Sequence, residues 1–107
     1  MQELTGTVTY WERIALPPET QLHVVLFAAG DHDETIAELS QPLDGAQVPV
    51  PFALAYPASA IDELTAYALR AELVFEDRVA FTTSDPVPVL TQGNPASGIE
   101  IRVRTNA

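Results

Sequence analysis

Few side chains of this sequence could take part in catalysis at neutral pH. Its two histidines, His23 and His32, are the candidate general bases, because imidazole titrates near neutrality. His23 lies within an alternating apolar run, where a lone histidine is usually a surface or packing residue. No serine stands in the G-x-S-x-G pattern of a nucleophile elbow. We therefore predict no catalytic residues and no enzymatic activity.

The second histidine belongs to an acidic run, residues 30–34, that offers oxygen ligands for a divalent cation. Asp31, Asp33 and Glu34 carry the carboxylates, which are the ligands that Ca²⁺ prefers. The run lacks the internal glycine of a calcium-binding loop, which follows the first carboxylates, and it lacks the distal glutamate. Glycine and aspartate are also the usual formers of turns. We expect a solvated hairpin loop here, with no metal and no cofactor.

The charge balance excludes further classes of function. The net charge is -10, from 15 acidic residues against five basic ones, and all five are arginines: Arg13, Arg70, Arg78, Arg102 and Arg104. A chain this acidic repels polyanions on average, so we expect neither nucleic acid nor an anionic lipid surface as partner. The absence of lysine excludes Schiff-base chemistry. The absence of cysteine excludes disulfides and thiolate metal sites.

The length of 107 residues predicts a single domain that spans the whole chain, residues 1–107. The longest apolar runs, such as residues 24–29, are far shorter than the ~20 residues of a membrane-spanning helix. Residues 1–4 show neither the basic nor the apolar region of a secretion signal. This pattern fits a cytoplasmic protein or a chain whose leader has been removed.

Period-two alternation of apolar and polar residues predicts strands. We expect seven of them, at residues 4–10, 21–28, 35–41, 48–56, 66–76, 78–83 and 99–103. Ile36 and Leu39 have opposite parity, which indicates either a bulge in the third strand or a different register from the one assumed here. Residues 66–76 also have helix-favouring composition, but the alternation of Tyr67 and Leu69 favours a strand.

The segments between these strands complete the expected architecture. Pro57 suits the start of a single helical turn within residues 57–64. Residues 84–97 contain too many proline and glycine signals for regular structure, and we expect them to pack over part of the sheets. The predicted fold is an all-β, about seven-stranded antiparallel β-sandwich with at most one short helical turn.

Two prolines mark one strand as a border of its sheet. Pro49 and Pro51 lie two residues apart, so the backbone donors that they lack would point to the same side. We therefore expect residues 48–56 to form an edge strand that is protected against pairing with another chain.

Trp11, Val25 and Phe27 are the predicted partner-binding residues. Parity places each of them opposite the core-facing side chains of its strand, so they would share an outer face if the first two strands pair. Large apolar side chains on an outer face are available for recognition. The competing interpretation is that residues 87–90 cover this face and bury it as a satellite core.

Several blocks of the sequence resemble one family. These blocks are residues 6–18 (GTVTYWERIALPP), residues 47–57 (QVPVPFALAYP) followed by Ile61 and Asp62, and the shorter blocks 67–71, 81–83 and 88–91. In order and content they resemble the YbaY/YscW-type lipoprotein family. The sequence departs from the family in having no lipobox cysteine and no aspartate between Tyr56 and Pro57.

The resemblance implies a β-sandwich in the bacterial cell envelope, often anchored by an acylated cysteine, and some members are pilotins that bind an outer-membrane secretin. We therefore expect a monomeric, non-enzymatic accessory domain of the envelope that binds a secretin-like or other polypeptide. One alternative is a small envelope enzyme or carbohydrate-handling protein with a pocket lined by His23 or by residues 31–34. Another is a cytoplasmic structural module.

Overall fold

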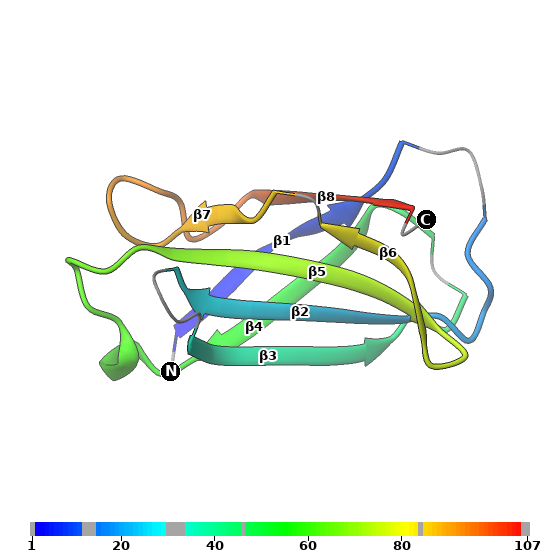
Figure 1. Ribbon diagram of the computed structural model, residues 1–107, viewed down its shortest axis with the longest axis horizontal. Helices are drawn as coiled ribbons and strands as arrows, with labels where there is room; N and C mark the ends of the chain where they lie inside the picture. The colour runs from blue at the N-terminus through cyan, green and yellow to red at the C-terminus, as the bar shows by residue number, and fades with distance from the viewer. Residues whose placement is uncertain (1, 12–14, 30–33, 46, 84, 106–107) are drawn as a thin grey trace.

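The regular structure of the chain is almost entirely β-strand, as a computed structural model shows for residues 2–11, 15–29, 34–45, 47–83 and 85–105 (Figure 1). The strands are β1 (Gln2–Thr9), β2 (Gln21–Ala28), β3 (Glu34–Pro42), β4 (Val50–Tyr56), β5 (Tyr67–Phe75), β6 (Arg78–Thr83), β7 (Val87–Val89) and β8 (Ile99–Thr105). One 3₁₀ turn, η1 (Ala58–Ala60), lies between β4 and β5. The predicted all-β class and its single helical turn are confirmed, with one strand more than expected.

The strands form one continuous path in the order β3-β2-β5-β6-β8-β1-β4, and β7 pairs with β5 beside this path. In Figure 1, β3, β2 and β5 form a front layer, and β1 and β4 run behind it at an angle. Because β6 and β8 connect the two layers, the sheet is nearly closed into a barrel instead of splitting into two separate sheets. The pairs are antiparallel except β1 with β8, which is parallel.

The assumption that the first two strands pair is wrong. β1 pairs with β4 and β8, whereas β2 pairs with β3 and β5. The two strands therefore lie in different layers, and their outward faces do not form one surface. Local alternation specifies which side of a strand faces the core, but it does not specify the neighbouring strand.

The space between the layers is filled by the inward residues of the alternating strands. In β4 the buried residues Val50, Phe52, Leu54 and Tyr56 alternate with exposed ones. Burial of each large apolar side chain contributes about 1.5–3 kcal/mol relative to exposure. Tyr10 stacks on Phe81 in this core, with ring centroids 4.5 Å apart.

β5 is a strand, as its alternation predicted, although its composition also favours helix. Tyr67, Leu69, Ala71 and Leu73 on one side are all buried in the core. Pairing with β2, β6 and β7 satisfies the backbone of β5, so tertiary context overrides the helix propensity of its alanines and leucines.

The predicted bulge in the third strand is also confirmed. Leu26 of β2 pairs with Ala37 and Phe27 pairs with Thr35, so Ile36 is an extra residue in β3. The extra residue shifts the parity of the strand. Ile36 and Leu39 consequently both pack against the core despite their odd spacing.

The segment that was expected to be irregular, residues 84–97, contains the short strand β7. Thr82 is the last residue of β6 that pairs with β5, whereas the pairing of β6 with β8 on its other side continues to Thr83. The first part of β5 is left with a free edge, and β7 occupies it through pairs such as Leu69 with Val87. β7 therefore extends the sheet beside β5 and does not cover an outer face, and its Val89 is buried in the main core.

β4 ends the strand path, as the proline pair predicted. The amide of Thr5 bonds to the Ala96 carbonyl, away from β4, so Thr5 and its partner Ala53 do not exchange backbone hydrogen bonds. In an antiparallel pair this arrangement recurs every two residues, so Thr7 and Pro51 do not exchange backbone hydrogen bonds either. The nitrogen of Pro51 therefore faces the open edge of β4. Pro49 precedes β4 and is not part of the strand, which corrects the prediction for that residue.

Candidate functional site

Trp11 is the most exposed aromatic side chain in the described part of the protein. It follows β1, and 74% of its surface is accessible. The neighbouring Tyr10 points the other way and is only 5% exposed, because it stacks on Phe81 in the core. The alternation of β1 thus continues past its last residue and holds the indole outward beside a fixed neighbour.

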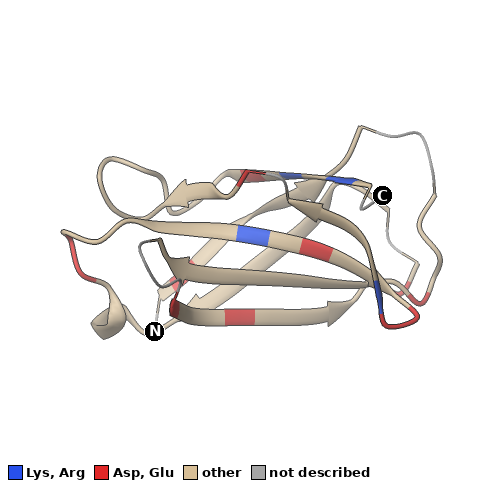
Figure 2. Ribbon diagram, in the orientation of Figure 1, with Lys and Arg blue, Asp and Glu red and all other residues tan. Residues whose placement is uncertain are grey.

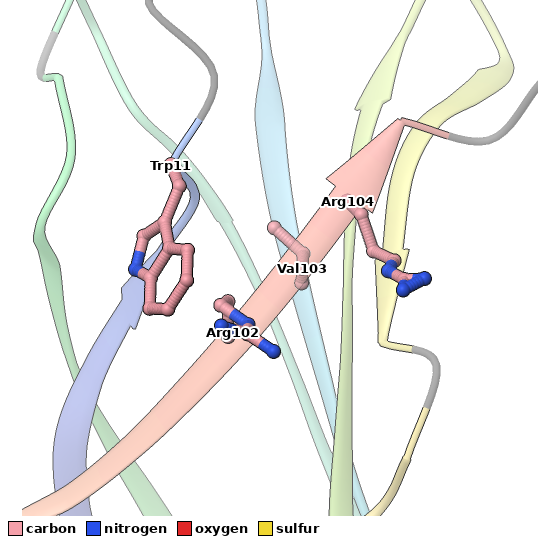
Figure 3. A pocket seen from close by; sticks show the side chains of 4 residues that line it. All are labelled: Trp11, Arg102, Val103 and Arg104. Carbon is pink, nitrogen blue, oxygen red and sulfur yellow. The ribbon is translucent and has the colours of Figure 1, made fainter.

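The indole of Trp11 is covered on one face by an arginine from the last strand. The guanidinium carbon of Arg102 lies 4.0 Å from the centroid of the Trp11 ring, in cation–π geometry (Figure 3). The parallel pairing of Thr9 with Arg102 brings these two side chains together. At an exposed site such a contact contributes about 0.5–1 kcal/mol, enough to favour one orientation of both side chains.

β8 continues this surface with a second arginine. Arg102 and Arg104 are two residues apart and exposed, while Val103 between them is buried. The four residues Trp11, Arg102, Val103 and Arg104 line a shallow hollow of about 330 Å³. In Figure 3, Trp11 and Arg104 lie on opposite sides of Arg102. We call Trp11, Arg102 and Arg104 the Trp11 surface.

The other side of Arg102 is acidic. Asp85, Val87, Glu100 and Arg102 line a second hollow of about 240 Å³. Arg102 therefore borders both hollows, with carboxylates on one side and Arg104 on the other. Figure 2 shows the corresponding red and blue segments along β8.

Neither arginine of the Trp11 surface forms a salt bridge to a carboxylate of the described residues. Among the described residues, the contacts of this kind are at His23, whose ring nitrogens lie 3.6 Å from a carboxylate oxygen of Glu38 and 3.5 Å from one of Glu72. Within the described part of the chain, Arg104 thus has no carboxylate partner, and the guanidinium group of Arg102 is stacked on Trp11. The sequence did not single out Arg102 and Arg104, although a chain with five arginines and no lysine carries these two at alternate positions of one strand.

Val25 and Phe27, the other two predicted binding residues, lie on β2 in the front layer. Both are 4% exposed, and they form a small buried cluster with Ala68. The guanidinium carbon of Arg70 lies 5.0 Å from the centroid of the Phe27 ring. The structure thus separates these two residues from Trp11 and places them in a satellite cluster, although residues 87–90 do not form its cover.

Of the two histidines considered for chemistry, His23 is the one that the structure describes. His23 lines none of the four main hollows of the described surface. His32, Asp31 and Asp33 lie outside the described residues. Among those that are described, no group of three or more histidine or acidic side chains could hold a metal ion. No helix among them is long and apolar enough to cross a membrane.

Comparison with known sequences identifies the family. Residues 1–101 match the profile of the family described as "Type III secretion system lipoprotein chaperone (YscW)". The chain belongs to the YscW family. Trp11 lies within the residues that match the family profile, whereas Arg102 and Arg104 follow the last matched residue.

Two relatives illustrate the YscW-type domain. The Escherichia coli K12 protein named "Uncharacterized lipoprotein YbaY" is 27% identical over 101 residues, which are 92% of this chain and 53% of that protein. The chain thus spans about half the length of this curated relative. A solved structure titled as an alternative pilotin from the type II secretion system of Vibrio cholerae superimposes with a TM-score of 0.88, at 28% identity and 98% coverage of both chains.

Proposed function

We propose that this YscW-family domain is a non-enzymatic accessory protein of the cell envelope that binds a polypeptide partner through the Trp11 surface. The observation that carries the proposal is the 74% exposure of Trp11 beside a buried, stacked Tyr10. Tryptophan and arginine are the residue types most enriched among binding hot spots.

The arrangement suits binding because the surface is already ordered. Tyr10 fixes the backbone beside Trp11, and Arg102 stacks on one face of the indole. Less side-chain freedom is therefore lost when a partner covers the other face, which lowers the entropic cost of association. The shallow hollow offers no enclosed space for a small substrate, but it fits the side chains of a docking segment.

The names of the relatives support the class of partner. The family is described as secretion lipoprotein chaperones, and the matching solved structure is a secretion pilotin. We infer a secretin-like protein or another envelope component as partner, and an envelope location for this chain. The domain itself would act as a monomer.

Affinity capture from the envelope fraction of the source cell tests the proposal. The wild-type domain should retain a defined protein, identified by mass spectrometry, that Trp11→Ala loses at unchanged thermal stability. Leu64→Ala is the matched control, because Leu64 is the other large exposed apolar residue and is 90% accessible. Equal capture by the wild type and Trp11→Ala would contradict the proposed site.

A further inference from the structure

The arginines of the Trp11 surface indicate the chemistry of its ligand. We propose that the docking segment is an acidic peptide segment: one carboxylate binds Arg104, and an adjacent apolar side chain lies against the free face of the Trp11 indole. This inference rests on the proposed function and adds the charge and the orientation of the partner to it.

The first argument is the pairing of charges. The chain has 15 acidic residues, yet Arg102 and Arg104 form no salt bridge with any described carboxylate. An arginine fork binds a carboxylate in bidentate geometry, and Arg104 has no described partner to compete for it. Arg102 differs, because its guanidinium group is stacked on Trp11 at 4.0 Å. Arg104 is therefore the better placed anchor.

The second argument is the polarity along β8. Glu100 and Asp85 line the hollow on the far side of Arg102, so that side repels a carboxylate. Among the described residues, the only charged ones that line the hollow bordered by Trp11, Arg102 and Arg104 are these two arginines. An acidic group of the ligand is thus directed toward Arg104 and away from Glu100.

A peptide fits this surface better than an anionic membrane does. At physiological salt the screening length is about 8 Å, so a single carboxylate responds mainly to the charges around the Trp11 surface. A lipid plane contacts a much wider area of the protein and meets its net charge of -10. Repulsion over that area opposes membrane binding, whereas a short peptide avoids it.

Selection from a random peptide library against the wild-type domain provides the probes. Selected peptides are synthesised with a fluorescent label, and each is paired with an isosteric version in which Asp or Glu becomes Asn or Gln. Fluorescence anisotropy then gives Kd for the wild type and for Trp11→Ala, Arg104→Gln and Arg78→Gln. Arg78→Gln removes the same charge from an exposed residue of β6 and serves as the matched control.

We expect an acidic position to be enriched among peptides that require Trp11. The amide isostere and Arg104→Gln should each raise Kd about two- to fivefold, and combining the amide peptide with Arg104→Gln should raise it no further. Arg78→Gln should leave Kd unchanged. Binding should also weaken with added salt, less so for Arg104→Gln. Arg104→Glu should regain binding when the acidic position of the peptide is changed to Lys.

Other outcomes separate the two proposals. Peptides that require Trp11 but bind equally as amide isosteres overturn the acidic ligand and leave the proposed function standing. If no selected peptide depends on Trp11, the surface itself is refuted along with its charge preference. A third outcome is that the wild type binds phosphatidylglycerol vesicles, Arg104→Gln does not, and the acidic and amide peptides bind with equal Kd. This outcome would assign the surface to lipid and overturn the inference.

Discussion

The hydroxyl of Thr83 bridges the backbone of Ala71 at the point where β6 leaves β5. It accepts a hydrogen bond from the Ala71 amide at 2.8 Å and donates one to the Ala71 carbonyl at 3.0 Å. One side chain thereby replaces the next rung of the backbone ladder between the two strands. This contact lets the pairing of β6 with β5 end at Thr82 without leaving the polar groups of buried Ala71 unsatisfied.

Replacement of Thr83 by valine should therefore destabilise the fold. The change keeps the side-chain shape but leaves the Ala71 amide and carbonyl without this partner, at a cost of about 1–3 kcal/mol. Urea unfolding of Thr83→Val measures the loss, and Thr82→Val is the matched control on the same strand. A difference below about 0.5 kcal/mol between the two variants would show that the bridge contributes little.

Gly6 should not tolerate a larger residue, because β1 and β8 approach closely there. A Cβ atom at this position would overlap the carbonyl oxygen of Ile99 and lie 2.8 Å from its carbonyl carbon. Both are backbone atoms of the paired strand, so the clash is relieved only by separating the strands. We expect Gly6→Ala to lower the free energy of unfolding by about 3 kcal/mol, at the upper end of overpacking effects.

The control for that variant is Thr5→Ala on the same strand, which removes atoms and adds none. Thermal unfolding followed by circular dichroism compares the two. A wild-type melting temperature for Gly6→Ala would mean that the parallel pairing of Gly6 with Ile99 is not as close as the structure shows.

Pro51 should protect the open edge of β4 against self-association. Its nitrogen faces outward, so Pro51→Val adds a backbone donor to an edge that already exposes the outward groups of Ala53. We expect concentration-dependent dimers by sedimentation velocity. Pro49→Val should have a smaller effect, since Pro49 lies before the strand, and a monomeric Pro51→Val at high concentration would argue against the protective role.

Trp11 and Phe27 should respond oppositely to truncation. Trp11 is 74% exposed and Phe27 is 4% exposed, so Trp11→Ala should change stability by less than about 1 kcal/mol, whereas Phe27→Ala should cost about 3–5 kcal/mol. The sequence contains a single tryptophan, so fluorescence reports on this residue alone, and we expect red-shifted, readily quenched emission. Blue-shifted emission that is protected from iodide would place the indole in the core instead.

The sequence by itself determined the local structure. Alternation identified β5 against its helix propensity, the parity of Ile36 and Leu39 indicated a bulge or a different register, and Pro51 marked the border strand. These features depend on residues close together in the chain. The side-chain period, the extra residue and the missing donor each act within one strand, so they can be inferred without knowing its neighbours.

Strand neighbours were decided only by the tertiary structure. The parallel pairing of β1 with β8 brings Arg102 onto Trp11, and the pairing of β2 with β5 buries Phe27 under Arg70. Alternation gives Trp11 and Phe27 the same outward parity, yet one is exposed and the other is covered. The reason is that the exposure of an outward side chain depends on the cross-strand residues beside it, and these are set by pairings between distant segments of the chain.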